Sequence, residues 1–305
     1  MRNLTLKDLA EACGADTRGD ETLSISGVSS LENPKHGTLV MAEREEHLKK
    51  LEGADFAALL HSDKLNSPLP SLLHSNPRIA LAKILELFHP RVVYPPGIHE
   101  SATVDSRADI DPTAHIGPFC TVGPRAKIGP GVVLRAFVLI SEDCVIGQNS
   151  ILQAHVIIGE GCSIGRDCQL EPWAKMNQDS VIEDGVDLGA HASLGREAIM
   201  KRGSKADNLV IVGPRSVIGP GSMLIGQSAV ERDAKLGSGV IIAGQSTVAA
   251  SSIVHNGVQV GSRSWVEGEL KEAGPYLGAP AIPLKAEMKR RALERQKERK
   301  NKVQS

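Results

Sequence analysis

Aliphatic residues recur at every sixth position through the middle of the chain. The series runs from Ile98 to Val266 without a skipped step, and Ala206 is its single member that is not a large aliphatic residue. Two positions before each of these anchors, from Val104 onward, the chain carries only Ala, Ser, Val or Cys. Three hexads form one coil, so the pattern predicts a triangular parallel β-helix with inward-pointing anchors and coils that pair as strands.

Small residues beside the anchors refine this picture. Glycine follows many anchors, for example at 117, 147 and 189, where we expect a tight corner that favours a residue without Cβ. Cys120, Cys144, Cys162 and Cys168 occupy the small position before an anchor and are expected to fill the core. Five cysteines without paired spacing indicate neither a disulfide framework nor a zinc site.

The two ends of the chain lack the hexad. Residues 1–96 predict a small α/β domain, with a helix that stops at Gly14, strands at 23–31, 37–42 and 55–62, and a helix that opens after Asn76 and ends before Pro90. Residues 97–270 form the predicted β-helix. Residues 271–305 begin with several Gly and Pro residues, which are expected to end the β-helix, and continue as a basic helical extension.

Charge is balanced overall but not in the tail. The chain has 35 Lys+Arg and 36 Asp+Glu, whereas residues 283–305 hold nine Lys/Arg against three Glu. This basic helix predicts an acidic partner, or else a solvated helix that packs between subunits. Overall charge and the lack of stacking aromatics near the tail argue against nucleic acid. No apolar run is long enough for a membrane span, and the first residues lack a signal-peptide core, so we expect a cytoplasmic protein.

The hexads resemble those of the hexapeptide-repeat acyltransferases. The N-terminal segments LKDLAEACGA, GVSSLENPKHGTLVMA, EEHLKKL and NPRIALAKILELF are similar, in this order, to the UDP-3-O-acylglucosamine N-acyltransferase family of lipid A biosynthesis. The resemblance implies a mainly β fold with a left-handed parallel β-helix, a homotrimer, and no cofactor. It also implies transfer of a 3-hydroxyacyl chain from acyl carrier protein to the amine of a UDP-3-O-acylglucosamine-type sugar nucleotide. The carrier would bind the basic tail, with contact residues Lys285, Lys289, Arg290, Arg291 and Arg295.

Two features of that family are missing. Its members carry a catalytic histidine two residues after an anchor, but here no histidine has this spacing, and the corresponding position falls on Pro214 or on Gly226, beside Gln227. The segment that would stack a uracil ring, 37–48, contains no Phe or Tyr. The chain therefore resembles a divergent member of the family.

One column of residues, three positions after the anchor in successive coils, contains two histidines that are candidates to replace the missing catalytic histidine. It reads Phe119, Phe137, His155, Trp173, His191, Leu209, Gln227 and Gln245, at about 4.8 Å per coil. One interpretation is a ring ladder that packs subunits together. The other is a substrate groove in which Gln227 binds substrate and a histidine acts as general base. His191 is the first candidate for this base and His155 the second.

The Arg202–Gly203 pair resembles a turn in related sugar-nucleotide acyltransferases. Arg202 would contact a phosphate there, or would be a solvated corner arginine. Two other functions stay open: acetylation of an amino sugar from acetyl-CoA, and a scaffold that has lost catalysis. A zinc-dependent carbonic anhydrase is disfavoured, because no His-x4-His pair is present, and no metal site is predicted.

Overall fold

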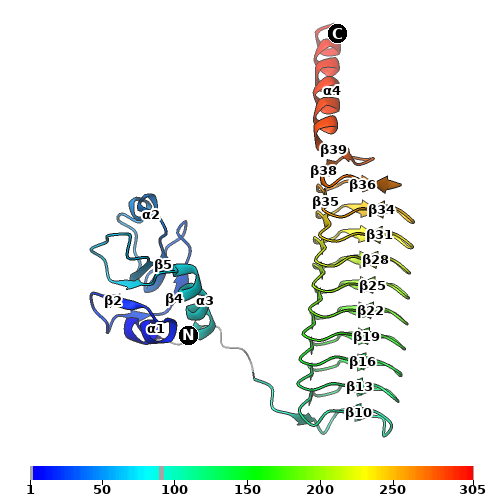
Figure 1. The fold of residues 1–305 in the computed structure, drawn as a ribbon, viewed down its shortest axis with the longest axis horizontal. Helices are drawn as coiled ribbons and strands as arrows, with labels where there is room; N and C mark the ends of the chain where they lie inside the picture. The colour runs from blue at the N-terminus through cyan, green and yellow to red at the C-terminus, as the bar shows by residue number, and fades with distance from the viewer. Residues whose placement is uncertain (1–2, 89–92, 305) are drawn as a thin grey trace. The chain divides into compact units, whose positions relative to one another are not determined.

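A computed structural model describes residues 3–88 and 93–304 of the chain. Two compact units are present, one reaching to Val93 and one beginning at Tyr94 (Figure 1). Within the described residues, no helix has both the length and the apolar character needed to cross a bilayer.

The N-terminal unit contains a five-stranded sheet with the order β2-β7-β6-β5-β4 and a two-stranded sheet, β1-β3. Strand β2 pairs antiparallel with β7, and the other neighbours in the larger sheet are parallel. The strands are β1 (Leu4–Thr5), β2 (Asp16–Arg18), β3 (Ser24–Ile25), β4 (Gly27–Ser29), β5 (Thr38–Met41), β6 (Ala58–His61) and β7 (Ser71–Leu73). The helices are α1 (Leu6–Cys13), α2 (Glu45–Lys50) and α3 (Pro77–Phe88).

Local sequence signals explain the helix ends. Thr5 forms a capping box with Asp8 at the start of α1, and Gly14 ends this helix in the left-handed conformation, with φ 75°. Helix α3 reaches Phe88, and the expected stop at Pro90 lies outside the described residues. The strand expected at 23–31 is divided into β3 and β4, which pair in different sheets.

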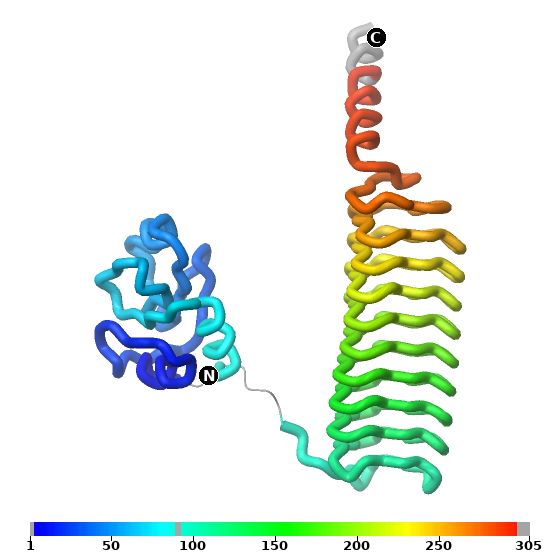
Figure 2. Tube along the Cα trace, viewed as in Figure 1, coloured from blue at the N-terminus to red at the C-terminus, as the bar shows by residue number. Residues whose placement is uncertain are grey.

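Three parallel sheets make up the β-helix of the second unit, and their strands alternate along the chain. Figure 2 shows the successive coils stacked on one another. Sheet I contains β8 (Gly97–Ile98), β11 (His115–Ile116), β14 (Val133–Leu134), β17 (Ile151–Leu152), β20 (Gln169–Leu170), β23 (Asp187–Leu188), β26 (Lys205–Ala206), β29 (Met223–Leu224), β32 (Ile241–Ile242), β35 (Val258–Val260), β38 (Gly274–Leu277) and the antiparallel β39 (Ile282–Pro283). Sheet II contains β9 (Thr103–Val104), β12 (Thr121–Val122), β15 (Leu139–Ile140), β18 (Ile157–Ile158), β21 (Lys175–Met176), β24 (Ser193–Leu194), β27 (Ile211–Val212), β30 (Ala229–Val230), β33 (Thr247–Val248) and β36 (Trp265–Val266). Sheet III contains β10 (Asp109–Ile110), β13 (Lys127–Ile128), β16 (Val145–Ile146), β19 (Ser163–Ile164), β22 (Val181–Ile182), β25 (Ile199–Met200), β28 (Val217–Ile218), β31 (Lys235–Leu236), β34 (Ile253–Val254) and β37 (Glu269–Leu270).

The predicted left-handed parallel β-helix is confirmed. Strands pair with the strand 18 residues later, for example Ile116 with Leu134, so anchor stacks on anchor; the last pairs, such as Val254 with Leu270, are 16 residues apart. From Ile116 to Val266 the anchors are buried and form one continuous core. In the first coil Ile98 is 54% exposed and Val104 and Ile110 are half-buried, because this coil has a neighbour on one side only.

Where the small residue two positions before an anchor is Ser or Cys, its side chain also forms a hydrogen bond in most coils. Ser150 Oγ donates to the Gly165 carbonyl at 2.8 Å, and Cys168 Sγ donates in the same way to the Glu183 carbonyl at 3.2 Å. Cys120, Cys144, Cys162, Ser216, Ser222 and Ser246 make the equivalent bond to the residue 15 positions later. These cysteines therefore do more than fill space, because each satisfies a corner carbonyl of the next coil. Burial raises the pKa of the Cys144 thiol to about 11, which disfavours the reactive thiolate.

The corners turn at the third residue after the anchor, not at the glycine that follows it. The third residue has φ near +60° at each of the three corners, as at Phe119, Arg125 and Gly131. Gly189, which follows its anchor, has no such φ, but a Cβ there would lie 2.5 Å from the Asp207 carbonyl carbon. The expected corner role of these glycines is thus wrong: close approach of the neighbouring coil excludes a side chain.

The C-terminal end closes the stack. Strand β38 continues sheet I past residue 270, where the charged extension was expected to begin, and β39 pairs back on it. Helix α4 (Leu284–Gln304) then projects beyond the last coil (Figure 1). Glu287, buried in its first turn, lies against Gly278, where an added Cβ would meet the carboxyl group at 3.0 Å.

Candidate functional site

Five aromatic rings stack along the corner where the chain passes from sheet I to sheet II. We call this the first corner, and it comprises residues 119, 137, 155, 173, 191, 209, 227, 245 and 263. The ring centroids of Phe119, Phe137, His155, Trp173 and His191 are separated in turn by 5.0, 4.9, 4.2 and 6.1 Å, with interplanar angles of 14° or less. Because the coils repeat in register, equivalent residues face each other at the spacing of aromatic stacking.

The two histidines of this ladder differ in accessibility. His155 is half-buried, with Phe137 on one ring face and Trp173 on the other. His191 is exposed at the end of the stack, and within residues 3–88 and 93–304 its ring nitrogens have no hydrogen-bond partner. A neutral imidazole in this position can accept a proton from an incoming nucleophile.

Beyond His191 the first corner becomes polar. Leu209 is half-exposed, and after it Gln245 Nε2 donates to Gln227 Oε1 at 3.0 Å. Arg263 Nε donates in turn to Gln245 Oε1 at 2.8 Å. The oxygen of Gln227 is therefore occupied, and its amide hydrogens are left to bind other groups.

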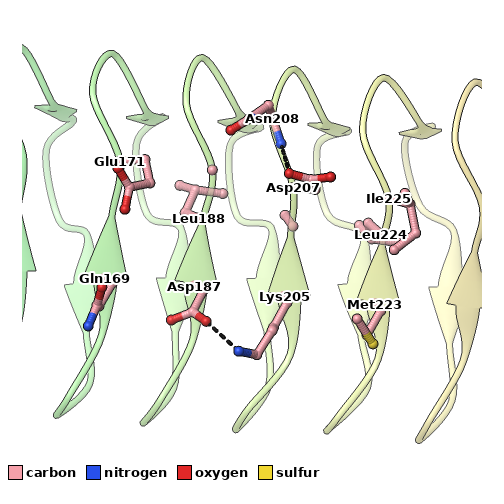
Figure 3. A pocket seen from close by; sticks show the side chains of 12 residues that line it. Gln169, Glu171, Asp187, Leu188, Lys205, Asp207, Asn208, Met223, Leu224 and Ile225 are labelled. Carbon is pink, nitrogen blue, oxygen red and sulfur yellow. Dashed lines mark hydrogen bonds and ion pairs between the residues drawn. The ribbon is translucent and has the colours of Figure 1, made fainter. Parts of the chain in front are cut away.

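A cavity of about 330 Å³ lies on sheet I beside this corner (Figure 3). Its lining residues are Gln169, Glu171, Asp187, Leu188, Gly189, Lys205, Ala206, Asp207, Asn208, Met223, Leu224 and Ile225. Gly189, which lies two residues before His191, is one of these lining residues. The cavity and the exposed histidine thus belong to the same edge of the β-helix.

Backbone hydrogen bonds fix the polar groups of the cavity. Asp207 accepts from the backbone N–H of Asn208 at 2.7 Å and of Gly226 at 3.2 Å. Asn208 Oδ1 accepts from the Ala190 N–H at 2.8 Å. Figure 3 shows Lys205 reaching Asp187, with Nζ and Oδ2 2.7 Å apart. Glu171 and Asp207 stay available as acceptors for an amine or for sugar hydroxyl groups.

Arg202 and Gly203 do not lie at this corner. They follow β25 at the turn from sheet III to sheet I, whereas His191 precedes β24 at the turn from sheet I to sheet II. Gly203 occupies the left-handed turn position, with φ 65°. Arg202 Nη2 is 3.3 Å from Asp184 Oδ2, a carboxylate that Arg166 also contacts at 3.2 Å. Hydrogen bonds from Arg166 and the charges of both arginines lower the pKa of Asp184.

The basic residues of α4 divide into two groups. Arg291 Nε lies 2.7 Å and Arg290 Nε 2.8 Å from the carboxylate of Glu287, whose pKa these hydrogen bonds lower. Part of their charge is therefore neutralised by a carboxylate of the same helix. Exposed side chains that form no such pair are Lys285, Lys289 and Arg295.

The N-terminal segment 37–48 borders a separate cavity of about 340 Å³. Its lining residues are Val28, Ser29, Ser30, Leu31, Glu32, Met41, Glu43, His47, Lys50 and Leu81. Arg78 binds Glu43 through two hydrogen bonds, of 2.6 and 3.0 Å, and His47 Nδ1 accepts from the Glu43 N–H. No Phe or Tyr lines this cavity, in agreement with the sequence of the segment.

The sheet I cavity was not predicted from the sequence. Two lining residues could have indicated it: Ala206, the one small anchor, and Gly189, which follows an anchor. Neither signal is specific alone, because glycine follows anchors at many other coils.

Comparisons with known proteins find similarity over part of the chain. Residues 98–201 match the family described as the GMPPB C-terminal domain. The UDP-3-O-acylglucosamine N-acyltransferase of Coxiella burnetii (strain Dugway 5J108-111) is 36% identical over 120 residues, 38% of this chain and 35% of that protein. UDP-3-O-acylglucosamine N-acyltransferase 1 of Legionella pneumophila (strain Paris) is 30% identical over 118 residues, 38% of this chain and 34% of that protein. The expected resemblance is thus confirmed, although the chain spans about a third of the length of these relatives.

Solved structures show a weaker likeness. The UDP-N-acetylglucosamine acyltransferase from Campylobacter jejuni is 21% identical, with a TM-score of 0.40, and covers 61% of this chain and 73% of its own. The Arabidopsis UDP-N-acetylglucosamine acyltransferase is 17% identical, with a TM-score of 0.36, and covers 64% of this chain and 77% of its own.

Proposed function

We propose that this protein is a cytoplasmic homotrimeric acyltransferase that transfers an acyl chain from a thioester to the amine of a sugar nucleotide. The observation that carries the proposal is the position of His191, an exposed imidazole two residues after Gly189, which lines a cavity together with the carboxylates of Glu171 and Asp207. The named relatives support the same reaction class. The proposed acceptor is a UDP-3-O-acylglucosamine-type sugar in lipid A biosynthesis, and the proposed donor is a 3-hydroxyacyl chain on acyl carrier protein.

The chemistry follows from one proton acceptor and a set of hydrogen-bonding groups. As the amine nitrogen attacks the thioester carbonyl carbon and the C–N bond forms, His191 takes the proton from nitrogen. The negative charge on the carbonyl oxygen needs a hydrogen-bond donor, and the free amide hydrogens of Gln227 are on the same corner. Collapse of the tetrahedral intermediate breaks the C–S bond, and the imidazolium returns its proton to the leaving thiolate.

Substrate contacts come from different corners. Glu171 and Asp207 orient the amino sugar in the cavity. Arg202 and Gly203 lie at another corner of the coil from His191. They bind a phosphate of the sugar nucleotide only if a neighbouring copy places this corner beside the cavity, and the proposal therefore includes a trimer. Lys285, Lys289 and Arg295, with the partly paired Arg290 and Arg291, attract the acidic carrier protein.

The test is a mass-spectrometric turnover assay with acyl-loaded carrier protein and UDP-3-O-acylglucosamine, run beside acetyl-CoA with UDP-amino sugars. We expect the N-acylated product from the first pair, and a fall of about 100-fold or more in kcat for His191→Ala. His255→Ala is the matched control, because His255 is ion-paired with Glu269 and is placed at no substrate. Full activity in His191→Ala and loss in His155→Ala would transfer the base to His155.

Two outcomes would replace the proposal. An acetylated product alone would establish sugar-nucleotide acetylation from acetyl-CoA. Absence of every product, with carrier protein still bound, would indicate a scaffold that kept the fold without the chemistry.

A further inference from the structure

The polar end of the first corner is a ladder of three exposed side chains in successive coils. Gln227, Gln245 and Arg263 occupy the same turn position, with φ values of 61°, 61° and 57°. The backbone N–H of each donates to the carbonyl of the residue 19 positions earlier, at 3.0, 3.3 and 3.1 Å. The three side chains therefore start from equivalent, hydrogen-bonded positions and meet where one coil borders the next.

An arginine at one end gives this ladder a direction. A guanidinium group carries N–H donors and no acceptor, so Arg263 can bind only the oxygen of the Gln245 amide. That bond, from Nε to Oε1, is 2.8 Å long, and it leaves Gln245 Nε2 to donate to Gln227 Oε1 at 3.0 Å. The oxygen of Gln227 thus faces Gln245, and its amide hydrogens lie on the opposite side.

Other amide groups of the β-helix follow the same rule. Arg196 Nη2 donates to Gln178 Oε1, so the amide of that glutamine also turns its oxygen toward the arginine of the next coil. Where the next coil offers a carboxylate, the amide turns over: Asn149 Nδ2 donates to Asp167 Oδ1 at 3.1 Å. The chemical group in the following coil therefore decides whether an amide directs its oxygen or its nitrogen toward that coil.

The reverse arrangement of the ladder loses a hydrogen bond. Rotation of the Gln245 amide by about 180° would direct its NH2 group at the N–H groups of Arg263, so that donors face each other. Gln227 would then turn as well, to donate to Gln245 Oε1, and its own oxygen would become the free group. Arg263 therefore selects the arrangement in which the amide hydrogens of Gln227 are free.

Gln227 lies close along the chain to the sheet I cavity. Ile225, two residues earlier, lines this cavity (Figure 3). The Gly226 N–H donates to Asp207 Oδ2 at 3.2 Å, so a carboxylate of the cavity holds the backbone just before Gln227. Gln227 is thus fixed from two directions, through its backbone toward the cavity and through its side chain toward Arg263.

We infer that Arg263 is a positioning residue: through Gln245 it turns the amide of Gln227 so that N–H groups, and not the carbonyl oxygen, face the reacting group. The inference deepens the proposed function and rests on it, because a donor matters there only if negative charge develops on a carbonyl oxygen. In the reverse arrangement an amide oxygen would face that charge and repel it. The effect belongs to the transition state, so kcat should depend on Arg263 while KM does not.

The first test reverses the ladder. In Arg263→Glu the carboxylate only accepts hydrogen bonds, so it should take the N–H of Gln245 and leave Gln227 with a free oxygen. Arg263→Lys keeps a donor and should keep the direction. In the mass-spectrometric assay we expect Arg263→Glu to lower kcat about 100-fold at unchanged KM, as loss of one oxyanion donor does, and Arg263→Lys to stay within about threefold of the wild type. The control is Arg107→Glu, the same charge change at an exposed arginine of the first coil, which should leave kcat unchanged.

A double variant links the loss to Gln227. Gln227→Leu should lower kcat to the same extent as Arg263→Glu. Arg263→Glu in that background should lower it no further, because the ladder then has no Gln227 amide to turn. Additive losses, equal losses in Arg263→Glu and Arg263→Lys, or full activity in Arg263→Glu would overturn the inference.

A measurement without turnover separates this inference from the proposed reaction. Glutamine labelled with nitrogen-15 allows the side-chain NH2 resonances to be observed by NMR and assigned with Gln227→Leu and Gln245→Leu. In Arg263→Glu the Gln227 NH2 group becomes hydrogen-bonded, so its resonances should shift and its hydrogen exchange should slow, whereas Arg263→Lys should match the wild type. Unchanged resonances in Arg263→Glu would overturn the role of Arg263. An inactive protein in which the amides still reverse would contradict the proposed reaction and leave that role intact.

Discussion

The hydrogen bonds of Ser150 allow the stability of one coil contact to be worked out. The side chain is completely buried, donates to the Gly165 carbonyl at 2.8 Å and accepts from the Cys168 N–H at 3.1 Å. Ser150→Ala therefore leaves one buried acceptor and one buried donor without this partner. An unsatisfied buried group costs about 1–3 kcal/mol, so we expect a loss of about 2–4 kcal/mol in the free energy of unfolding.

The matched variant is Ser150→Cys. The chain itself places cysteine at equivalent positions, and Cys168 Sγ reaches its carbonyl at 3.2 Å. Because a thiol is a weaker donor than a hydroxyl, Ser150→Cys should recover about half of the loss. Ser238→Ala, at an exposed serine, should change stability by less than about 0.5 kcal/mol.

Two measurements are suited to a repeat protein. Urea unfolding followed by circular dichroism reports the total free energy, and amide hydrogen exchange at Cys168 reports the local contact. In Ser150→Ala the free energy of unfolding should fall and amide exchange at Cys168 should become faster. Equal stability of Ser150→Ala and the wild type, or no advantage of cysteine over alanine, would refute the claim that this position is retained for hydrogen bonding.

Two further predictions concern the end of the stack and the cavity floor. The folded pKa of Glu287 is lowered, mainly by hydrogen bonds from Arg291 and its neighbour, so its stabilisation of α4 is present above the unfolded value near 4.5 and is lost as pH falls through the folded pKa. Amide exchange in the first turn of α4 should accelerate over that acidic range in the wild type but show little pH dependence in Glu287→Gln; identical profiles would contradict this role. Gly189→Ala should destabilise by about 1–3 kcal/mol in thermal or urea unfolding, because its Cβ would lie 2.5 Å from the Asp207 backbone, whereas Gly226→Ala, whose nearest contact is 3.4 Å, should be tolerated; equal effects would argue against close coil approach.

Much of the architecture could be predicted from the sequence, because every coil of the β-helix repeats the same six-residue pattern. Anchors at every sixth residue place aliphatic side chains inside, and each coil buries its anchors on the previous one. The sequence likewise predicted the helix α1 and its end at Gly14, whereas its start at the Thr5 capping box came from the structure. The glycines after the anchors were misinterpreted, because their sequence context is the same whether the constraint is a turn or a neighbouring coil.

The candidate site was only partly predictable. The column containing His155 and His191 followed from folding the sequence at 18 residues per coil, and their stacking agrees with that register. The cavity beside them did not follow, since it depends on how Glu171, Asp187 and Asp207 project from three successive coils. Arg202 lies close to His191 in the sequence but at another corner, because a few residues are enough to cross from one sheet to the next.

Periodicity, small residues and charge segregation are one-dimensional properties, and they determined the β-helix, its aliphatic core and the basic helix at its end. Which polar groups meet is three-dimensional, and only the folded chain decided it. Residues 18 apart become neighbours, so Gln227 bonds to Gln245 of the next coil, while Arg290 and Arg291 bind a buried carboxylate one helical turn away. The physical reason is that burial and hydrogen bonding act over a few ångströms in space, whatever the separation along the chain.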